Sequence, residues 1–221
     1  IIAITQPLID NENGVRMTPD EFIAYCARVS NPSNQMNSLT ASKLLRYCAK
    51  HKHWSIFETV NVTMSIETTR DIARQILRHR SFSFQEFSQR YADPTQDLGF
   101  VTREARLQDM KNRQNSIETD NDELQSHWEA QQWLIKGEVE RAYKWAIENG
   151  IAKEQARAVL PEGLTVSRMY MNGTLRSWIH YCQLRMGPET QKEHREVARD
   201  AWYQITEVFP SLKDCLDIGE K

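Results

Sequence analysis

Glycine spacing is the feature of this 221-residue chain that most limits what it can fold into. The chain has 8 glycines, and the closest pair, Gly163 and Gly173, is ten residues apart. A dinucleotide-binding Rossmann fold needs G-x-G-x-x-G and a P-loop fold needs G-x-x-x-x-G-K-[ST], so both are excluded. If this protein binds nucleotides, it does so without a glycine-rich loop. Arginine suits that task as a bidentate phosphate ligand, and 18 of the 28 basic residues are Arg.

Charge and cysteine usage narrow the class further. A formal net charge of −2 with 26% charged residues is ordinary for a soluble globular protein and argues against a dedicated polyanion binder. The four cysteines form no C-x-x-C pair, which indicates core thiols in a reducing cytoplasm. No run of about 18 apolar residues occurs, so no transmembrane helix is predicted. We expect one cytoplasmic domain spanning residues 1–221.

Residues 1–92 predict strands and helices in turn. A short strand at residues 1–8 precedes a helix that Thr18 caps and Pro19 enters, and a second helix covers residues 40–51. Apolar and polar residues alternate from 60 to 67, the period of a half-buried strand. The next helix, about 70–79, places its apolar residues on one arc and its polar residues on the other.

The second half of the chain begins with a polar stretch at residues 93–122, whose composition fits a lid, an oligomer contact or a disordered loop. Helices are expected at about 124–148, 154–159, from Gly173-Thr174 onward and past Gly187-Pro188, with weak strand character at 165–171. In the helix at 124–148 the residues available for packing are Trp128, Leu134, Val139, Ala142 and Trp145. The pattern predicts an α+β fold with a mixed sheet and several long helices.

The segment from Arg78 to Arg90 carries the most chemistry. It combines cations, hydroxyls, one carboxylate and three phenylalanines just past a helix end, and so offers several donors for phosphate. Two other interpretations compete. One is a solvated basic helix end with its phenylalanines in the core. The other is a patch for single-stranded RNA, in which Phe82, Phe84 and Phe87 stack on bases.

Arg78-His79-Arg80, followed after seven residues by Ser88, resembles the signature of the flavin-dependent thymidylate synthases. Glu86 and Arg90 fit its extended form, although the family commonly has Asn where this chain has Gln85. Other blocks resemble the family in the same order, across about two-thirds of the chain: His53-x-Ser55-x-x-Glu58, residues 157–161, and residues 175–180 with Leu184-Arg185.

This resemblance implies an enzyme that converts dUMP to dTMP. The carbon comes from methylenetetrahydrofolate and the hydride from FADH₂, which NADPH regenerates. It also implies a homotetramer with shared active sites, an α+β fold of the family's own, and neither a nucleic acid polymer nor a membrane as partner. The other type of thymidylate synthase needs a Pro-Cys-His nucleophile. No Cys here is followed by His, which disfavours that chemistry.

The resemblance also assigns residues. Arg185 is implied to stabilise negative charge on the uracil, since a guanidinium cannot act as a base, and His53 to aid folate or flavin geometry. The implied flavin contacts are Ser55, Arg78, His79, Arg80, Glu86, Thr174, Leu175, Arg176 and His180; for the last block, free N–H groups at a helix start favour a pyrophosphate. The implied dUMP contacts are Gln75, Arg78, Glu86, Phe87, Ser88, Gln89, Arg90, Arg185 and, from a neighbouring subunit, Arg157.

Three alternatives remain beside this interpretation. An arginine-rich module for single-stranded RNA predicts binding that depends steeply on salt. A purely structural helical assembly protein predicts no ligand at all. The pair His51-x-His53 suggests a metal site, but no third ligand is nearby in the sequence, so we expect none.

Overall fold

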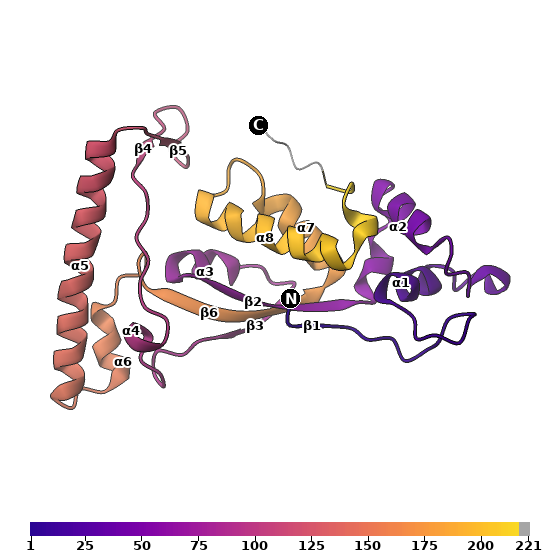
Figure 1. Cartoon of the computed structure of the whole chain (residues 1–221), viewed down its shortest axis with the longest axis horizontal. Coiled ribbons are helices and arrows are strands. Elements are labelled where there is room, and N and C mark those ends of the chain that lie inside the picture. The colour runs from indigo at the N-terminus through magenta and orange to yellow at the C-terminus, as the bar shows by residue number, and fades with distance from the viewer. Residues whose placement is uncertain (217–221) are drawn as a thin grey trace.

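The computed structural model describes residues 1–216, and a four-stranded sheet lies at its centre (Figure 1). The strand order is β1 (Ala3–Ile4), β2 (Asn61–Thr69), β6 (Val166–Thr174) and β3 (Ser83–Glu86). The α+β class is confirmed. The expected mixed sheet is wrong, because all three strand pairs are antiparallel. Strand β2 leaves the sheet at the end where β6 enters it, so the two strands run in opposite directions.

The β2–β6 ladder is the longest pairing in the sheet. It runs without interruption from Asn61 opposite Thr174 to Thr69 opposite Val166. The alternation predicted for residues 60–67 is confirmed, with Val62, Met64 and Ile66 buried. Strand β6 is longer than its sequence suggested, since polar residues interrupt its apolar pattern.

Three helices pack along one side of the sheet (Figure 1): α3 (Arg70–Ile76), α7 (Leu175–Arg185) and α8 (Lys192–Val208). Helix α3 is shorter than the predicted 70–79, with Leu77 as its C-cap. Helices α1 (Pro19–Ala27) and α2 (Ala41–Lys50) lie toward one end of the sheet. Thr18 caps α1 as expected, in a capping box with Glu21. The long helix α5 (Asp122–Glu148) and the short α6 (Lys153–Ala156) stand at the opposite end.

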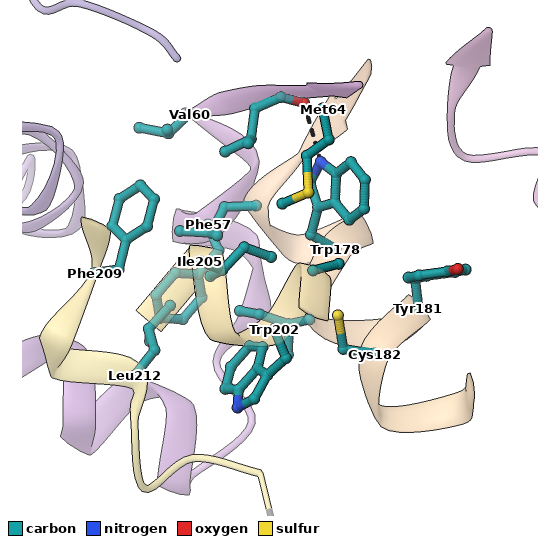
Figure 2. Close-up of a cluster of buried hydrophobic side chains, with 14 of the residues drawn as sticks. Phe57, Val60, Met64, Trp178, Tyr181, Cys182, Trp202, Ile205, Phe209 and Leu212 are labelled. Atoms are coloured by element: carbon teal, nitrogen blue, oxygen red, sulfur yellow. Dashed lines mark hydrogen bonds between the residues drawn. The ribbon is translucent and has the colours of Figure 1, made fainter. Parts of the chain in front are cut away.

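The core forms where α7, α8 and the segment before β2 meet the sheet (Figure 2). Trp178 is 0% exposed, and its indole Nε1 donates to the backbone oxygen of Val62 at 3.0 Å. The Phe82 ring packs edge-on against Trp178, with centroids 4.9 Å apart. Through Trp178, this core packs α7 against the sheet.

Phe82 also packs onto Gly173, the next-to-last residue of β6. A Cβ atom at position 173 would lie 2.4 Å from the Phe82 ring, so only glycine allows this approach. Phe82 and Phe84 thus pack on the core. The RNA-binding alternative therefore loses two of the three aromatic rings on which it depended.

The polar stretch at 93–122 forms defined elements. They are α4 (Pro94–Asp97) and a hairpin of β4 (Arg106–Gln108) with β5 (Ser116–Glu118). The hairpin is held to the start of α8, where the Lys192 ammonium contacts Glu118 and Glu104 at 2.6 and 2.7 Å. The four remaining short helices are η1 (Pro32–Asn34), η2 (Trp54–Glu58), η3 (Arg157–Val159) and η4 (Pro210–Leu212).

Helix α5 differs most from expectation. Of the five residues available for packing, Val139 and Ala142 are half-buried, whereas Trp128, Leu134 and Trp145 are exposed. The buried face carries Gln132, Tyr143 and Ala146 instead. The Gln132 side-chain amide forms two hydrogen bonds with the backbone of Arg103. It accepts from the N–H and donates to the oxygen, both at 2.8 Å. Within one chain, α5 therefore buries a partly polar face and leaves an apolar one open.

Two further sequence expectations concern thiols and membranes. All four cysteines are free, with Cys48 and Cys182 buried and Cys26 and Cys215 half-buried, which confirms scattered thiols. No helix within residues 1–216 is long and apolar enough to cross a membrane.

We expect Gly173→Ala to destabilise the protein by about 1–3 kcal/mol, because the added methyl overpacks a ring held between Trp178 and Phe84. Gly137→Ala is the matched control: it adds a methyl in α5 with nothing within 4 Å and should gain about 0.5–1 kcal/mol from helix propensity. Melting temperatures at one fixed protein concentration measure both. Equal melting of Gly173→Ala and the wild type would contradict the packing argument.

Candidate active site

The end of α3 and the end of α7 meet on the helix side of the sheet. There the Arg185 Nε donates to the His79 Nε2 at 2.9 Å, although the two residues are 106 positions apart in sequence. The turn after α3 places His79, whose N–H donates to the oxygen of Ile76 at 3.0 Å. The structure thus joins the Arg78-His79-Arg80 block to the last residue of the block that ends at Arg185.

The environment of His79 fixes its charge. Burial, and then the neighbouring Arg185 cation, lower the pKa of His79 to about 4. The ring is therefore neutral near pH 7, and its Nε2 lone pair is free to accept from Arg185. Tyr181 packs edge-on against the ring, with centroids 5.0 Å apart. Arg185 uses only its Nε donor in this contact, so its two Nη groups remain available to other partners.

Gln75 lies beside this pair and belongs to a polar network. Its Nε2 donates to the Gln191 Oε1 at 2.9 Å, and its Oε1 lies 3.1 Å from the His194 Nδ1. His194 is 0% exposed and also contacts the Tyr181 hydroxyl at 3.2 Å. The family resemblance implied a role for Gln75, but no motif indicated His194, Tyr181 or Gln191.

A second group of predicted residues lines an open groove of about 690 Å³ at the start of α7. His53, Ser55 and Arg176 lie along it, with Tyr47 and Trp54 as aromatic walls and Lys52 as a second cation. Lys52 has a φ of +59°, a backbone conformation that non-glycine residues seldom adopt. Aromatic walls beside two cations suit a planar ring system that carries phosphate.

The start of α7 offers fewer free N–H groups than the sequence suggested. Thr174 caps the helix by accepting from the Ser177 N–H at 3.2 Å. The Leu175 N–H donates to the Val60 oxygen at 2.8 Å, and the Leu175 side chain is fully buried. Arg176 forms an ion pair with Glu58. Phosphate binding here therefore depends more on side-chain cations than on the helix terminus.

His180 lies one turn beyond Arg176 and is exposed at the edge of this region. Its ring meets Trp54 edge-on, with centroids 5.5 Å apart. Partial burial, and then the Arg176 cation, lower the pKa of His180. The two side chains therefore share a helix face, as their spacing predicted.

A third group lies where β3 ends. Glu86 accepts from the Ser167 Oγ at 2.8 Å and lies 3.6 Å from the Arg70 guanidinium, so it is a fixed, paired carboxylate. The Phe87 N–H donates to the Arg168 oxygen, and Ser88 is half-buried in the turn that follows. Gln89 is 5% exposed, and its Nε2 lacks a partner within residues 1–216.

Arg90 and Arg157 both approach Glu154 on α6. Arg90 forms an ion pair with its carboxylate at 3.3 Å, and the Arg157 Nε donates to its backbone oxygen at 3.2 Å. Both guanidinium groups are exposed. Arg78 and Arg80, also exposed, have no ion-pair partner in the described part of the chain. All four guanidinium groups are thus accessible to an anion from solvent.

One chain does not bring all the predicted residues together. Arg157 precedes β6 and Arg176 follows it, so the nine residues of that strand lie between them. A strand of this length spans about 26 Å at about 3.3 Å per residue. Arg157 near Glu154 and the groove at α7 thus lie at opposite ends of β6.

The residues that sequence reasoning missed had one detectable signal. His194 precedes Ala198, Ala201 and Ile205 by four, seven and eleven positions, which places it on the buried face of α8. A buried histidine on an apolar face must find hydrogen-bond partners. Nothing local in the sequence indicates that those partners are Gln75 and Tyr181.

Comparisons with known proteins find relatives over nearly the whole chain. A family model described as "Thymidylate synthase complementing protein" matches residues 15–211. A "Probable flavin-dependent thymidylate synthase" of Paramecium bursaria Chlorella virus 1 is 48% identical over 98% of this chain and 97% of its own length. A "Flavin-dependent thymidylate synthase" of Synechocystis sp. is also 48% identical, with the same coverage.

Solved structures share the fold. The UMP/dUMP methylase PolB from Streptomyces cacaoi, bound with 5-Br dUMP, superposes with a TM-score of 0.73 over 99% of this chain and 98% of its own. Its sequence identity of 22% supports the fold alone. The family model and the two relatives at 48% identity carry the assignment further: this chain belongs to the flavin-dependent thymidylate synthase family.

Proposed function

We propose that this chain catalyses the reductive methylation of dUMP to dTMP, with methylenetetrahydrofolate as carbon donor and NADPH as reductant. The single observation that carries the proposal is the contact of Arg185 with the neutral ring of His79 at 2.9 Å. It places a fixed cation beside the Arg78-His79-Arg80 block. When bound, FAD would supply the hydride that reduces the transferred carbon to a methyl group.

Arg185 acts on the uracil. Its guanidinium stays charged at any working pH, so it stabilises the negative charge that develops as N3 ionises and C5 becomes nucleophilic. His79 takes the Nε donor and leaves both Nη groups to face the base. Because His79 is neutral, it orients the cation without adding a second positive charge.

The nucleotide is held by Gln75 and by the turn after β3. Glu86 is fixed by Ser167 and Arg70, and it positions the turn that carries Phe87, Ser88, Gln89 and Arg90. Gln89 brings a buried amide that needs a partner. Arg90 and Arg157 supply exposed guanidinium groups for the phosphate, which they bind in bidentate fashion.

The groove beside α7 would hold the flavin. His53 and Ser55 contribute polar contacts, Tyr47 and Trp54 provide flat surfaces, and Arg176 binds phosphate. Thr174 and Leu175 fix the helix start, and His180 flanks it. Arg78 and Arg80, on either side of His79, would add cations for the flavin phosphates.

We further propose a cytoplasmic homotetramer in which residues 1–221 form one domain and each site draws on more than one subunit. Helix α5 exposes Trp128 at 43%, Ile135 at 47% and Trp145 at 60%, an apolar face suited to a second copy of the chain. A neighbouring subunit can then supply Arg157, which one chain holds at the far end of β6. The free thiols suit a reducing compartment.

The function is tested directly with the purified protein. We expect a bound-flavin absorbance spectrum after addition of FAD, and NADPH oxidation with methylenetetrahydrofolate that depends on dUMP and yields dTMP. Arg185→Ala should lower turnover by about 10²–10³-fold while flavin and dUMP still bind, whereas Arg199→Ala, at an exposed site on α8, should not. A protein that binds no flavin would overturn the proposal.

The shared site predicts complementation between two impaired variants. Arg157→Ala and Arg185→Ala alone should each be nearly inactive. In mixed oligomers, about a quarter of the sites would contain both arginines, so activity should return to about that fraction. Two Arg185→Ala preparations mixed with each other provide the control. If mixed oligomers are shown to form and remain inactive, both arginines of a site come from the same subunit.

The low pKa of His79 predicts how stability responds to acid. The folded protein titrates this ring at about 4 instead of 6.5, so below pH 6.5 the unfolded chain binds the extra proton and the free energy of unfolding falls as pH drops. His79→Asn keeps an acceptor for Arg185 but does not titrate. Its melting temperature should therefore decline less between pH 7 and pH 5 than that of the wild type.

Other groups titrate in the same range but are common to both proteins. His194, with a pKa near 4, adds to the acid loss, and Asp20, with a pKa raised to about 6 by burial, opposes it. The comparison therefore removes the contribution of Asp20 and reports His79 together with its effect on the neighbouring His194. Parallel pH profiles for the wild type and His79→Asn would show that the ring is not titrating as described.

A further inference from the structure

A hydrogen-bond chain runs through the molecule behind Gln75 and links three helices to the β4–β5 hairpin. From α7, the Tyr181 hydroxyl meets the His194 Nε2 at 3.2 Å. From α8, the His194 Nδ1 meets the Gln75 Oε1 of α3 at 3.1 Å. Gln75 continues to Gln191 at 2.9 Å, and Gln191 to the Glu193 Oε2 at 2.9 Å.

The far end of this chain is fixed by charge. Arg106 of the hairpin, with its side chain only 10% exposed, forms an ion pair with the Glu193 carboxylate. Burial alone would raise the pKa of Glu193, but hydrogen bonds from the backbone and from Gln191, together with Arg106, hold it below its ordinary value. Glu193 is therefore ionised and can only accept hydrogen bonds.

The Glu193 carboxylate at one end of the chain can only accept, and this fixes the donor and the acceptor of each hydrogen bond. Because Glu193 must accept, Gln191 presents its Nε2 to Glu193 and its Oε1 to Gln75. Gln75 must then present Nε2 to Gln191 and Oε1 to His194. An amide oxygen only accepts, so the His194 Nδ1 carries the proton and its Nε2 accepts from Tyr181.

The protonation states of His194 and Tyr181 support this direction. Burial, followed by Arg185 and His79, lowers the pKa of His194 to about 4, so the ring is neutral and has one donor and one acceptor. Burial raises the pKa of Tyr181, so its hydroxyl keeps its proton and can donate. Each member of the chain thus has a single orientation.

We infer that His194 is a positioning residue for Gln75, fixing its amide so that the second N–H of Nε2 is left to donate to an acceptor oxygen of the bound nucleotide. This inference rests on the proposed function, in which Gln75 contacts dUMP. Without His194, the Gln75 Oε1 loses its donor, and the hydrogen bond to Gln191 is left to hold the amide alone. An amide fixed at one end only is less well positioned, which weakens its contact with the nucleotide.

The test is a double-mutant cycle on dUMP affinity. His194→Leu is expected to raise the KM for dUMP about tenfold, the equivalent of one lost hydrogen bond of about 1.4 kcal/mol. In a Gln75→Ala background, the same change should have no further effect, because the amide that His194 orients is absent. His194→Asn, whose side chain can donate from the Nδ1 position, should restore most of the affinity. Flavin affinity, read from the absorbance spectrum, should stay unchanged throughout.

Tyr181→Phe provides a milder variant should His194→Leu fail to fold. It removes only the donor to the His194 Nε2, and a smaller rise in KM that also vanishes in the Gln75→Ala background would support the inference. A KM that rises equally with and without Gln75, or that does not change in folded variants, would overturn it. A wild-type protein that neither binds nor turns over dUMP would instead contradict the proposed function.

Discussion

The antiparallel pairing of β2 with β6 is the constraint on which the rest of the structure depends. Helix α3 begins directly after β2, and α7 begins directly after β6, so the two helices start at opposite ends of one ladder. Both lie on the same side of the sheet (Figure 1). Their 7 and 11 residues span about 27 Å together, close to the length of about 26 Å of a nine-residue ladder. The C-terminal ends of α3 and α7 therefore lie close together near the middle of the ladder, where Arg185 contacts His79.

Local patterns were enough to predict most elements. The alternation in β2, the Thr18 cap of α1 and the apolar arc of α3 each depend on neighbours in sequence, and the structure confirms all three. Strand pairing depends on residues about a hundred positions apart, so the sequence suggested a mixed sheet where the pairs are antiparallel. Helix α5 shows a different limit. An apolar face has the same sequence pattern whether it packs on its own chain or on another, and here Trp128 and Trp145 are exposed.

The candidate site was predictable as a set of residues but not as an arrangement. Ordered motif blocks named Gln75, His79 and Arg185, and the structure brings these three together. The blocks did not indicate that Arg90 and Arg157 gather around Glu154, far from the groove at α7. Nor did they indicate His194, because its importance comes from contacts with α3 and α7 rather than from a motif. A residue whose role is to orient another residue belongs to no local motif, so a single sequence does not indicate it.

Thr174 is at once the last residue of β6 and the cap of α7, so no linker separates the strand from the helix. One inserted residue near this junction would turn α7 by about 100° relative to the sheet and carry Arg185 away from His79. Between residues 166 and 185, chain length should therefore be invariant among active relatives. The loop of the β4–β5 hairpin bears no such restriction, and length changes in the family are expected to accumulate there.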